Sequence, residues 1–185
     1  MSKEQTFYDN LIPLDIFMYK ASGFIGKAIG FLTLSDWAHV SRYIGIVNGK
    51  HMICESHLDT GVVEKEFDPK WIDSVVVYRQ HLRKHEMVSL IRCLRKHLGR
   101  KYDCGAFPAT WFRSTIGMIL NLKWLRLGVP ILNDKNTEFC SEYQAIAGKE
   151  AGIPLVVNVN PYNASPADIV RDGLCHFVFA GKDCK

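Results

Sequence analysis

The chain has 185 residues, of which 48% are hydrophobic and 23% charged, and its formal net charge is +4 at pH 7. This balance is that of a folded globular protein and excludes a largely disordered chain. The positive charge is too small for a nucleic-acid-binding domain, so no nucleic-acid partner is expected.

Neither a signal-peptide core nor a run of about 18 uninterrupted apolar residues occurs. We therefore expect a cytoplasmic protein without stable membrane insertion. No repeat or linker divides the sequence, which favours a single domain over residues 1–185. In a reducing compartment the six cysteines are expected to be free thiols.

The first half of the chain is rich in strand signals. Residues 14–19 are predicted to form a strand and residues 23–32 a short helix. Strands are then expected over residues 40–47, 51–56, 61–67 and 74–78, with a strong hairpin turn at Asn48-Gly49. These short strands predict an antiparallel meander.

The second half is mainly helical. Residues 83–98 have one apolar face and end at Gly99, and His81, His85 and His97 in this basic region are expected to be exposed. A helix over residues 116–132 would carry apolar side chains around nearly its whole circumference, which indicates either a buried helix or a lid that covers apolar ligands. A helix capped by Asn136 or Thr137 is expected to run to Ala151, before a last strand over residues 174–180.

Cys140 occupies the position best suited to a nucleophile. It lies near the predicted start of a helix, where the helix dipole and unpaired backbone N–H groups favour a thiolate and can stabilise an oxyanion. Cys104, also near a predicted helix start, is the best competitor. For any one cysteine the alternative is a small buried apolar side chain.

A cysteine nucleophile needs a base, usually histidine, and a group that orients the base. His39 stands where a loop enters a strand, beside Trp37. Period-two alternation places Glu55 and His57 on one face of the next strand, at the same hairpin end as His39. Glu55 is the favoured orienting group and His57 the second candidate.

The same cluster of histidines, Glu55 and Cys140 has zinc binding as an alternative. The HExxH spacing of helical zinc sites is absent, as are phosphate-binding loops and the GxSxG motif. We therefore expect no metal and no other cofactor.

Six short motifs occur in a characteristic order: Leu14-Asp15-Ile16-Phe17, Trp37-Ala38-His39-Val40, Glu55-Ser56, Lys101-Tyr102-Asp103, Phe139-Cys140-Ser141-Glu142 and Ser165-Pro166-Ala167-Asp168. In this order the chain resembles the circularly permuted papain-like hydrolases, the YiiX-like relatives of the bacterial NlpC-type cell-wall peptidases. Leu14, Ala38, Ser41 and Arg42 depart from the residues usual in that family.

The resemblance implies an α+β, papain-like and circularly permuted fold, with an antiparallel sheet or partial barrel packed against helices that include the nucleophile helix. Carried over by motif, it assigns Cys140 as nucleophile, His39 as base and Glu55 as the orienting group. Trp37 and Tyr102, in the same motifs, are expected to contact substrate.

The function expected from this resemblance is that of a cysteine peptidase or amidase, which cleaves an amide bond through a thioester acyl-enzyme. The substrate is expected to be a small peptide or a lipid-like acyl compound. Two alternatives stay open: a lipid-directed acyl hydrolase or acyltransferase, and an inactive relative that only binds a peptide or lipid.

Overall fold

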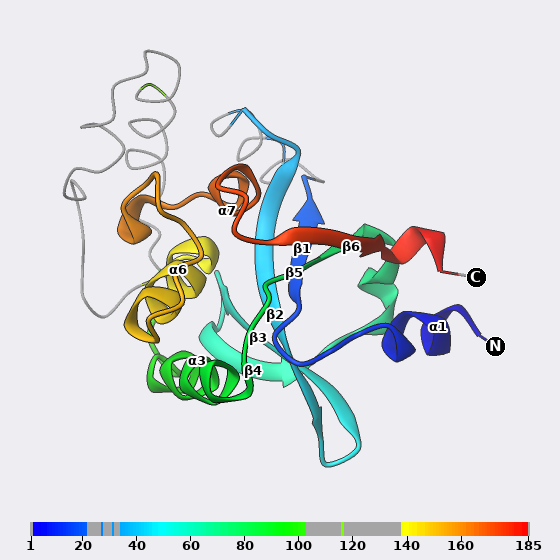
Figure 1. Ribbon diagram of the computed structural model, residues 1–185. Helices are drawn as coiled ribbons and strands as arrows, with labels where there is room; N and C mark the ends of the chain where they lie inside the picture. The colour runs from blue at the N-terminus through cyan, green and yellow to red at the C-terminus, as the bar shows by residue number, and fades with distance from the viewer. Residues whose placement is uncertain are drawn as a thin grey trace.

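A six-stranded antiparallel sheet forms the centre of the computed structural model, which describes residues 2–21, 27, 31, 34–102, 116 and 138–184 (Figure 1). Its strands are β1 (Ile16–Lys20), β2 (Trp37–Val47), β3 (Lys50–His57), β4 (Gly61–Glu66), β5 (Val75–Arg79) and β6 (His176–Ala180). Their order in the sheet is β4-β3-β2-β1-β5-β6. Because β4 and β6 form its two edges, the sheet is open, and the predicted α+β class with an antiparallel sheet packed against helices is confirmed.

The β2–β3 hairpin forms where the turn chemistry predicts it. Asn48 and Gly49 have positive φ angles of 52° and 77°, the left-handed conformation that a two-residue hairpin turn requires. Strands β1 to β4 follow one another as a meander. The predicted meander ends there, because β5 pairs with β1, with Ile16 opposite Tyr78, and not with β4.

Both faces of the sheet are covered. In Figure 1, α3 (Lys84–Lys96), α6 (Cys140–Glu150) and α7 (Pro166–Arg171) lie on one side, and α1 (Lys3–Asp9) lies on the other. The described residues also form three short 3-10 helices: η1 (Pro69–Ser74), η2 (Pro161–Asn163) and η3 (Gly181–Asp183). Neither α1 nor α7 was predicted from the sequence.

A glycine follows the C-terminal end of each of the two long helices. Gly99 and Gly152, which follow α3 and α6, have φ angles of 85° and 75°. Such angles are readily adopted only by glycine. The α6 helix ends at Glu150, one residue before the predicted end, whereas α3 ends at Lys96, two residues before residue 98.

The start of α6 differs from the prediction. Its N-cap is Phe139, so Cys140 is the first residue of the helix, and the expected cap at Asn136 or Thr137 is wrong. A carboxylate oxygen of Glu142 accepts a hydrogen bond from the backbone N–H of Phe139 at 3.3 Å. This bond satisfies the N–H of the N-cap residue, whereas the phenyl side chain of Phe139 cannot accept from the N–H groups of the first turn as a small polar cap would.

Arg42 ties β2 to α6. Its side chain is fully buried, and its Nε donates to Oε1 of Gln144 at 3.1 Å, across 102 positions of sequence. Another guanidinium N–H donates to the backbone oxygen of Leu14 at 3.2 Å. The departure from an aliphatic residue at this position thus supplies a hydrogen bond that holds α6 against the sheet.

The helices predicted over residues 23–32 and 116–132, and Cys104, lie outside the described residues, apart from the isolated positions 27, 31 and 116. Within the described part of the chain, no helix combines the length and the apolar character needed to cross a membrane.

Candidate active site

His39 and Glu55 meet on one face of the β2–β3 hairpin. The register of the two strands, with Arg42 opposite Cys54, places them at the same hairpin end. His39 Nε2 lies 2.8 Å from Glu55 Oε2, and the side chains are 24% and 4% exposed. The ring of His57, the other candidate partner, is 6.3 Å from that of His39. Of the two candidates, Glu55 is therefore the one in hydrogen-bond contact with the imidazole.

Cys140 reaches the same imidazole from the opposite layer. It is 1% exposed, packs in an apolar cluster with Met18 and Val40, and is within hydrogen-bond reach of His39. Since Nε2 is engaged by Glu55, Nδ1 is the ring nitrogen through which His39 can exchange a proton with the thiol. The first backbone N–H groups of α6 have no acceptor within the helix and are oriented to receive an anion.

Electrostatics favour charged forms at this site. Burial by itself would lower the pKa of His39, but Cys140 and Glu55 outweigh it and raise the pKa to about 10. Burial would also raise the pKa of Glu55, yet His39 and Lys65 lower it to about 2. At neutral pH the site therefore holds an imidazolium beside a carboxylate.

The His39–Glu55 pair makes stability depend on pH in a defined window. The contribution of Glu55 is present above 4.5 and is lost as pH falls towards about 2. The contribution of His39 is full below 6.5 and is lost as pH rises towards about 10. The difference in unfolding free energy between the wild type and a His39→Gln, Glu55→Gln double variant should thus be largest between those two unfolded-state values. Urea unfolding at acidic, mildly acidic and alkaline pH measures it, and a pH-independent difference would contradict the assignment.

Two neighbours of the pair were missed in the sequence. Tyr19, opposite His39 in the β1–β2 register, has its ring centroid 5.2 Å from that of the imidazole. Lys65 Nζ lies 2.5 Å from Glu55 Oε1. For Lys65 a signal was present: the turn between the predicted strands 51–56 and 61–67 fixes a register that places it diagonally across from Glu55.

A pocket of about 660 Å³ opens beside His39 and Glu55, and Tyr102 is part of its wall, as are Tyr19, His57, Lys65 and Trp71. Cys140 is not among the lining residues. Tyr102 and Ala38 pack on Phe139, next to Cys140 in the sequence. The pocket thus reaches His39 but not the sulfur of Cys140.

Trp37, the other expected substrate contact, does not line this pocket. It packs on the apolar cluster that contains Cys140, and its ring meets that of Tyr78 edge to face, with centroids 6.0 Å apart. The structure therefore brings Tyr102, but not Trp37, to the space beside His39.

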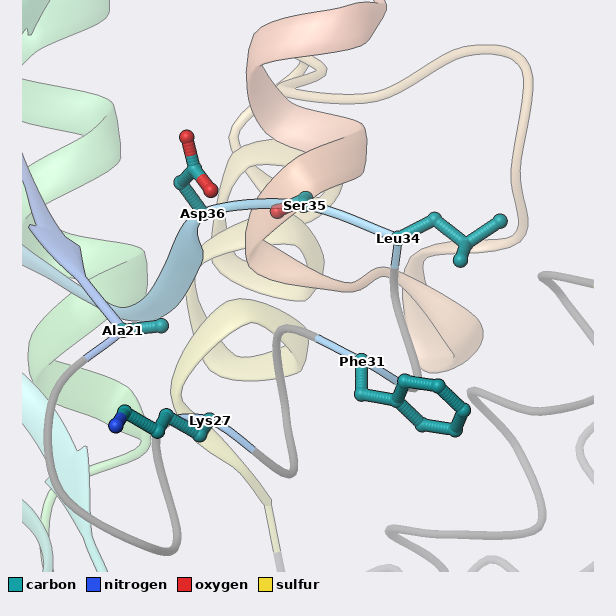
Figure 2. Close-up of a pocket in the computed structure, with 6 residues that line it drawn as sticks. All are labelled: Ala21, Lys27, Phe31, Leu34, Ser35 and Asp36. Carbon is teal, nitrogen blue, oxygen red and sulfur yellow. The ribbon is translucent and has the colours of Figure 1, made fainter.

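A second pocket, of about 540 Å³, is lined by residues of the connection between β1 and β2 (Figure 2). Its lining residues are Ala21, Lys27, Phe31, Leu34, Ser35 and Asp36. Neither His39, Glu55 nor Cys140 is among them, so this pocket contains none of the candidate catalytic groups.

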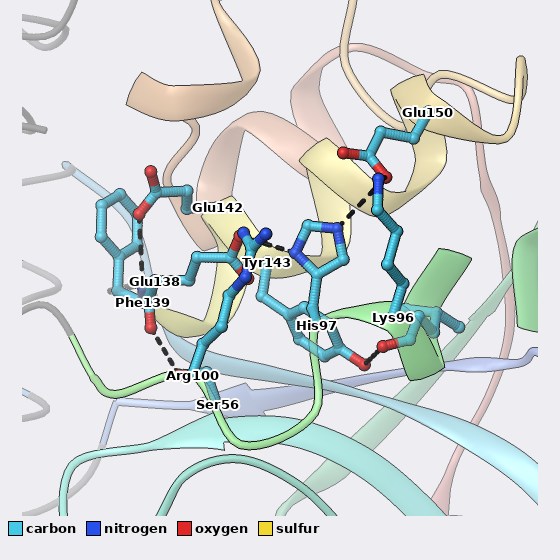
Figure 3. Close-up of polar contacts among 10 residues, drawn as sticks. Ser56, Lys96, His97, Arg100, Glu138, Phe139, Glu142, Tyr143 and Glu150 are labelled. Carbon is cyan, nitrogen blue, oxygen red and sulfur yellow. Dashed lines mark hydrogen bonds and ion pairs between the residues drawn. The ribbon is translucent and has the colours of Figure 1, made fainter. Parts of the chain in front are cut away.

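A polar network links the C-terminal end of α3 to both ends of α6 (Figure 3). His97 Nδ1 lies 2.6 Å from Oε1 of Glu138, which Arg100 also contacts, and His97 Nε2 lies 3.3 Å from Oε2 of Glu150. The hydroxyl of Ser56 donates to the backbone oxygen of Glu138 at 2.5 Å. His97 thus connects the residue two positions before Cys140 with the last residue of the helix.

The expectation that His97 is exposed is wrong: the side chain is fully buried. The α3 helix ends at Lys96, and His97 is its C-cap. The basic face of the helix therefore does not extend to this residue, whose ring turns inward to the two glutamates.

Comparison with protein-family models and with curated proteins finds no match. Among solved structures, the chain is similar to the crystal structure of the metalloprotein yiiX from Escherichia coli O157:H7. The match has 17% sequence identity and a TM-score of 0.63, and it covers 91% of this chain and 96% of the other. This likeness shows a shared fold, as the YiiX-like part of the resemblance predicts. The papain-like affiliation and the circular permutation stay predictions.

Proposed function

We propose that this protein is a cysteine hydrolase that cleaves an amide, peptide-like bond through a thioester acyl-enzyme. Cys140 is the nucleophile, His39 exchanges the proton, and Glu55 orients His39 and stabilises its charged form. One observation carries the proposal: Cys140, the first residue of a helix, and the buried carboxylate of Glu55 both reach the same imidazole.

The chemistry follows from these positions. The Cys140 thiolate attacks the acyl carbon, and backbone N–H groups at the start of α6 stabilise the oxyanion. The tetrahedral intermediate expels the amine, which takes its proton from His39, and the acyl group stays on sulfur as a thioester. His39 then removes a proton from water, whose oxygen attacks the thioester. The carboxylic acid leaves, and the thiolate–imidazolium pair is restored.

The pocket beside His39 favours an acyl group with apolar character. Leu58 and Trp71, which line it, are 51% and 46% exposed. These two side chains also favour the second candidate, a lipid-directed acyl hydrolase. The apolar segment 116–132, which first suggested that alternative, lies outside the described residues.

The described part of the chain contains no set of side chains that could hold a metal ion for a metal-dependent reaction. The similar structure is described as a metalloprotein, but no group of three or more His, Cys, Asp or Glu side chains among the described residues is arranged to hold a metal ion. His39 and Glu55 are in direct hydrogen-bond contact at 2.8 Å. The described residues therefore do not fit a metal, and the mechanism uses none.

Trapping the acyl-enzyme tests the proposal. The protein is mixed with an activated ester of N-acetylphenylalanine, quenched in acid, and analysed by intact mass and by peptide mapping. We expect one acyl group, on Cys140. Cys93, a partly buried thiol on α3, is the internal control, since no histidine contact is found for it within the described residues.

Acyl transfer to Cys93 alone, or to no cysteine, would contradict the proposed nucleophile. A matched panel of dipeptide amides and fatty-acyl esters then separates the two substrate classes. Turnover of the fatty-acyl esters alone would favour the lipid-directed alternative over the amidase.

A further inference from the structure

We infer that Lys65 is a positioning residue that acts on His39 through Glu55. Its ammonium group contacts the second carboxylate oxygen of Glu55 and partly neutralises the negative charge of the carboxylate. The inference rests on the proposed function, in which His39 must both hold a proton and give it up to the leaving amine. It adds a fourth member, from a different strand, to the group formed by Cys140, His39 and Glu55.

The sheet register brings Lys65 to this position. In the β3–β4 pair, Glu55 lies opposite Val63 and Ile53 lies opposite Lys65. Lys65 is therefore diagonal to Glu55 on the same face of the sheet, within reach of a long side chain. Its Nζ lies 2.5 Å from Glu55 Oε1.

Each oxygen of Glu55 has its own cation. Oε2 contacts His39, and Oε1 is buried without a hydrogen bond of regular geometry, so that in the described part of the chain the ammonium of Lys65 is its polar partner. A buried carboxylate oxygen without any partner would carry its full desolvation cost. Lys65 removes this cost and fixes the plane of the carboxylate.

Charge sharing has a consequence for the proton on His39. The groups that face His39 are Cys140 from α6, Glu55 and His57 from β3, and Tyr19 from β1. Lys65 places a positive charge beside Glu55, on the side away from His39. This charge weakens the electrostatic stabilisation of the imidazolium by the carboxylate. An imidazolium that is stabilised less strongly has a lower pKa and is therefore a better acid towards the leaving amine.

Lys65 is half-exposed and lines the pocket beside His39, as does Lys70. Lys70 pairs with Asp68 at 2.5 Å and not with Glu55. Lys70 is thus a matched control: it is a lysine of the same pocket wall whose charge is directed elsewhere.

The experiment compares Lys65→Met, Lys65→Arg and Lys70→Met with the wild type. The pKa of His39 is measured by NMR titration of the imidazole, assigned with His39→Gln, and kcat and KM are measured with an uncharged substrate. For Lys65→Met we expect the pKa of His39 to rise by roughly half a unit to one unit. The kcat should fall by about threefold to tenfold with KM unchanged. Lys65→Arg should stay close to the wild type, and Lys70→Met should leave the pKa of His39 unchanged.

An unchanged or lowered pKa of His39 in Lys65→Met, or an equal shift in Lys70→Met, would overturn the inference. The titration is made on the resting protein and needs no turnover. A shift in Lys65→Met with no hydrolysis by any form would therefore refute the proposed function and leave the Lys65–Glu55–His39 coupling established.

Discussion

Replacing Cys140 with alanine is expected to reduce kcat for amide hydrolysis by at least about 10⁴-fold, because the covalent route through the thioester is lost. The change removes one sulfur atom from a buried position in the apolar cluster with Met18 and Val40. The fold should therefore persist, which circular dichroism and urea unfolding will check. Steady-state kinetics with the best substrate of the dipeptide panel measures the loss.

Two further variants make this test specific. Cys93→Ala, on α3 and away from the site, should keep kcat within a factor of about two, since it touches none of the reacting groups. His39→Ala should lose about as much activity as Cys140→Ala, and the double variant hardly more, because residues that act as a unit are not additive. Losses of the two single variants that multiply in the double variant would show that Cys140 and His39 do not act in one step.

Replacing Glu138 with leucine is expected to lower the free energy of unfolding by about 3 kcal/mol, the cost of removing one partner from a buried charged contact. Glu138 is 2% exposed, and its Oε1 contacts both His97 and Arg100. Leucine fills the space but leaves the buried imidazole and the guanidinium without their acceptor. Urea unfolding followed by tryptophan fluorescence measures the change.

The control for this prediction is Glu66→Gln. Glu66 pairs with Lys50 at 2.7 Å, but both side chains are more than half exposed, so its loss should change stability by no more than about 0.5 kcal/mol. Equal effects of the two variants would contradict a supporting role for the buried network. Because Glu138 lies two residues before Cys140, we expect the destabilised variant to lose activity as well.

The contact between His39 and Glu55 could be predicted from the sequence because local rules determine it. Asn48-Gly49 fixes the hairpin turn, and period-two alternation then fixes which side chains share a face. The choice between Glu55 and His57 is a matter of side-chain direction and of the Lys65 ammonium on the neighbouring strand. Alternation alone does not contain that information.

The parts that sequence analysis missed depend on contacts between distant segments. The pairing of β5 with β1 depends on the tertiary packing of the meander. No turn motif in the sequence predicts this pairing. His97 seemed part of an exposed basic helix, yet the helix ends one residue earlier and the ring meets Glu138 and Glu150, which follow it by 41 and 53 positions. Phe139 is an unusual N-cap, because its apolar side chain has no acceptor for the N–H groups of the first turn.

The hydrogen bond between Arg42 and Gln144 joins residues 102 positions apart, and this separation imposes an order on folding. The hairpins β2–β3 and β3–β4 close short loops and can form early, whereas docking of α6 must close a loop of most of the chain and comes late. During synthesis the imidazole and its carboxylate are therefore assembled on the sheet before the thiol leaves the ribosome. A nascent chain carries the scaffold of the proposed catalyst before the proposed nucleophile, and the core is complete only after the segments that follow α6, with Val159, Ile169 and Cys175, have been added.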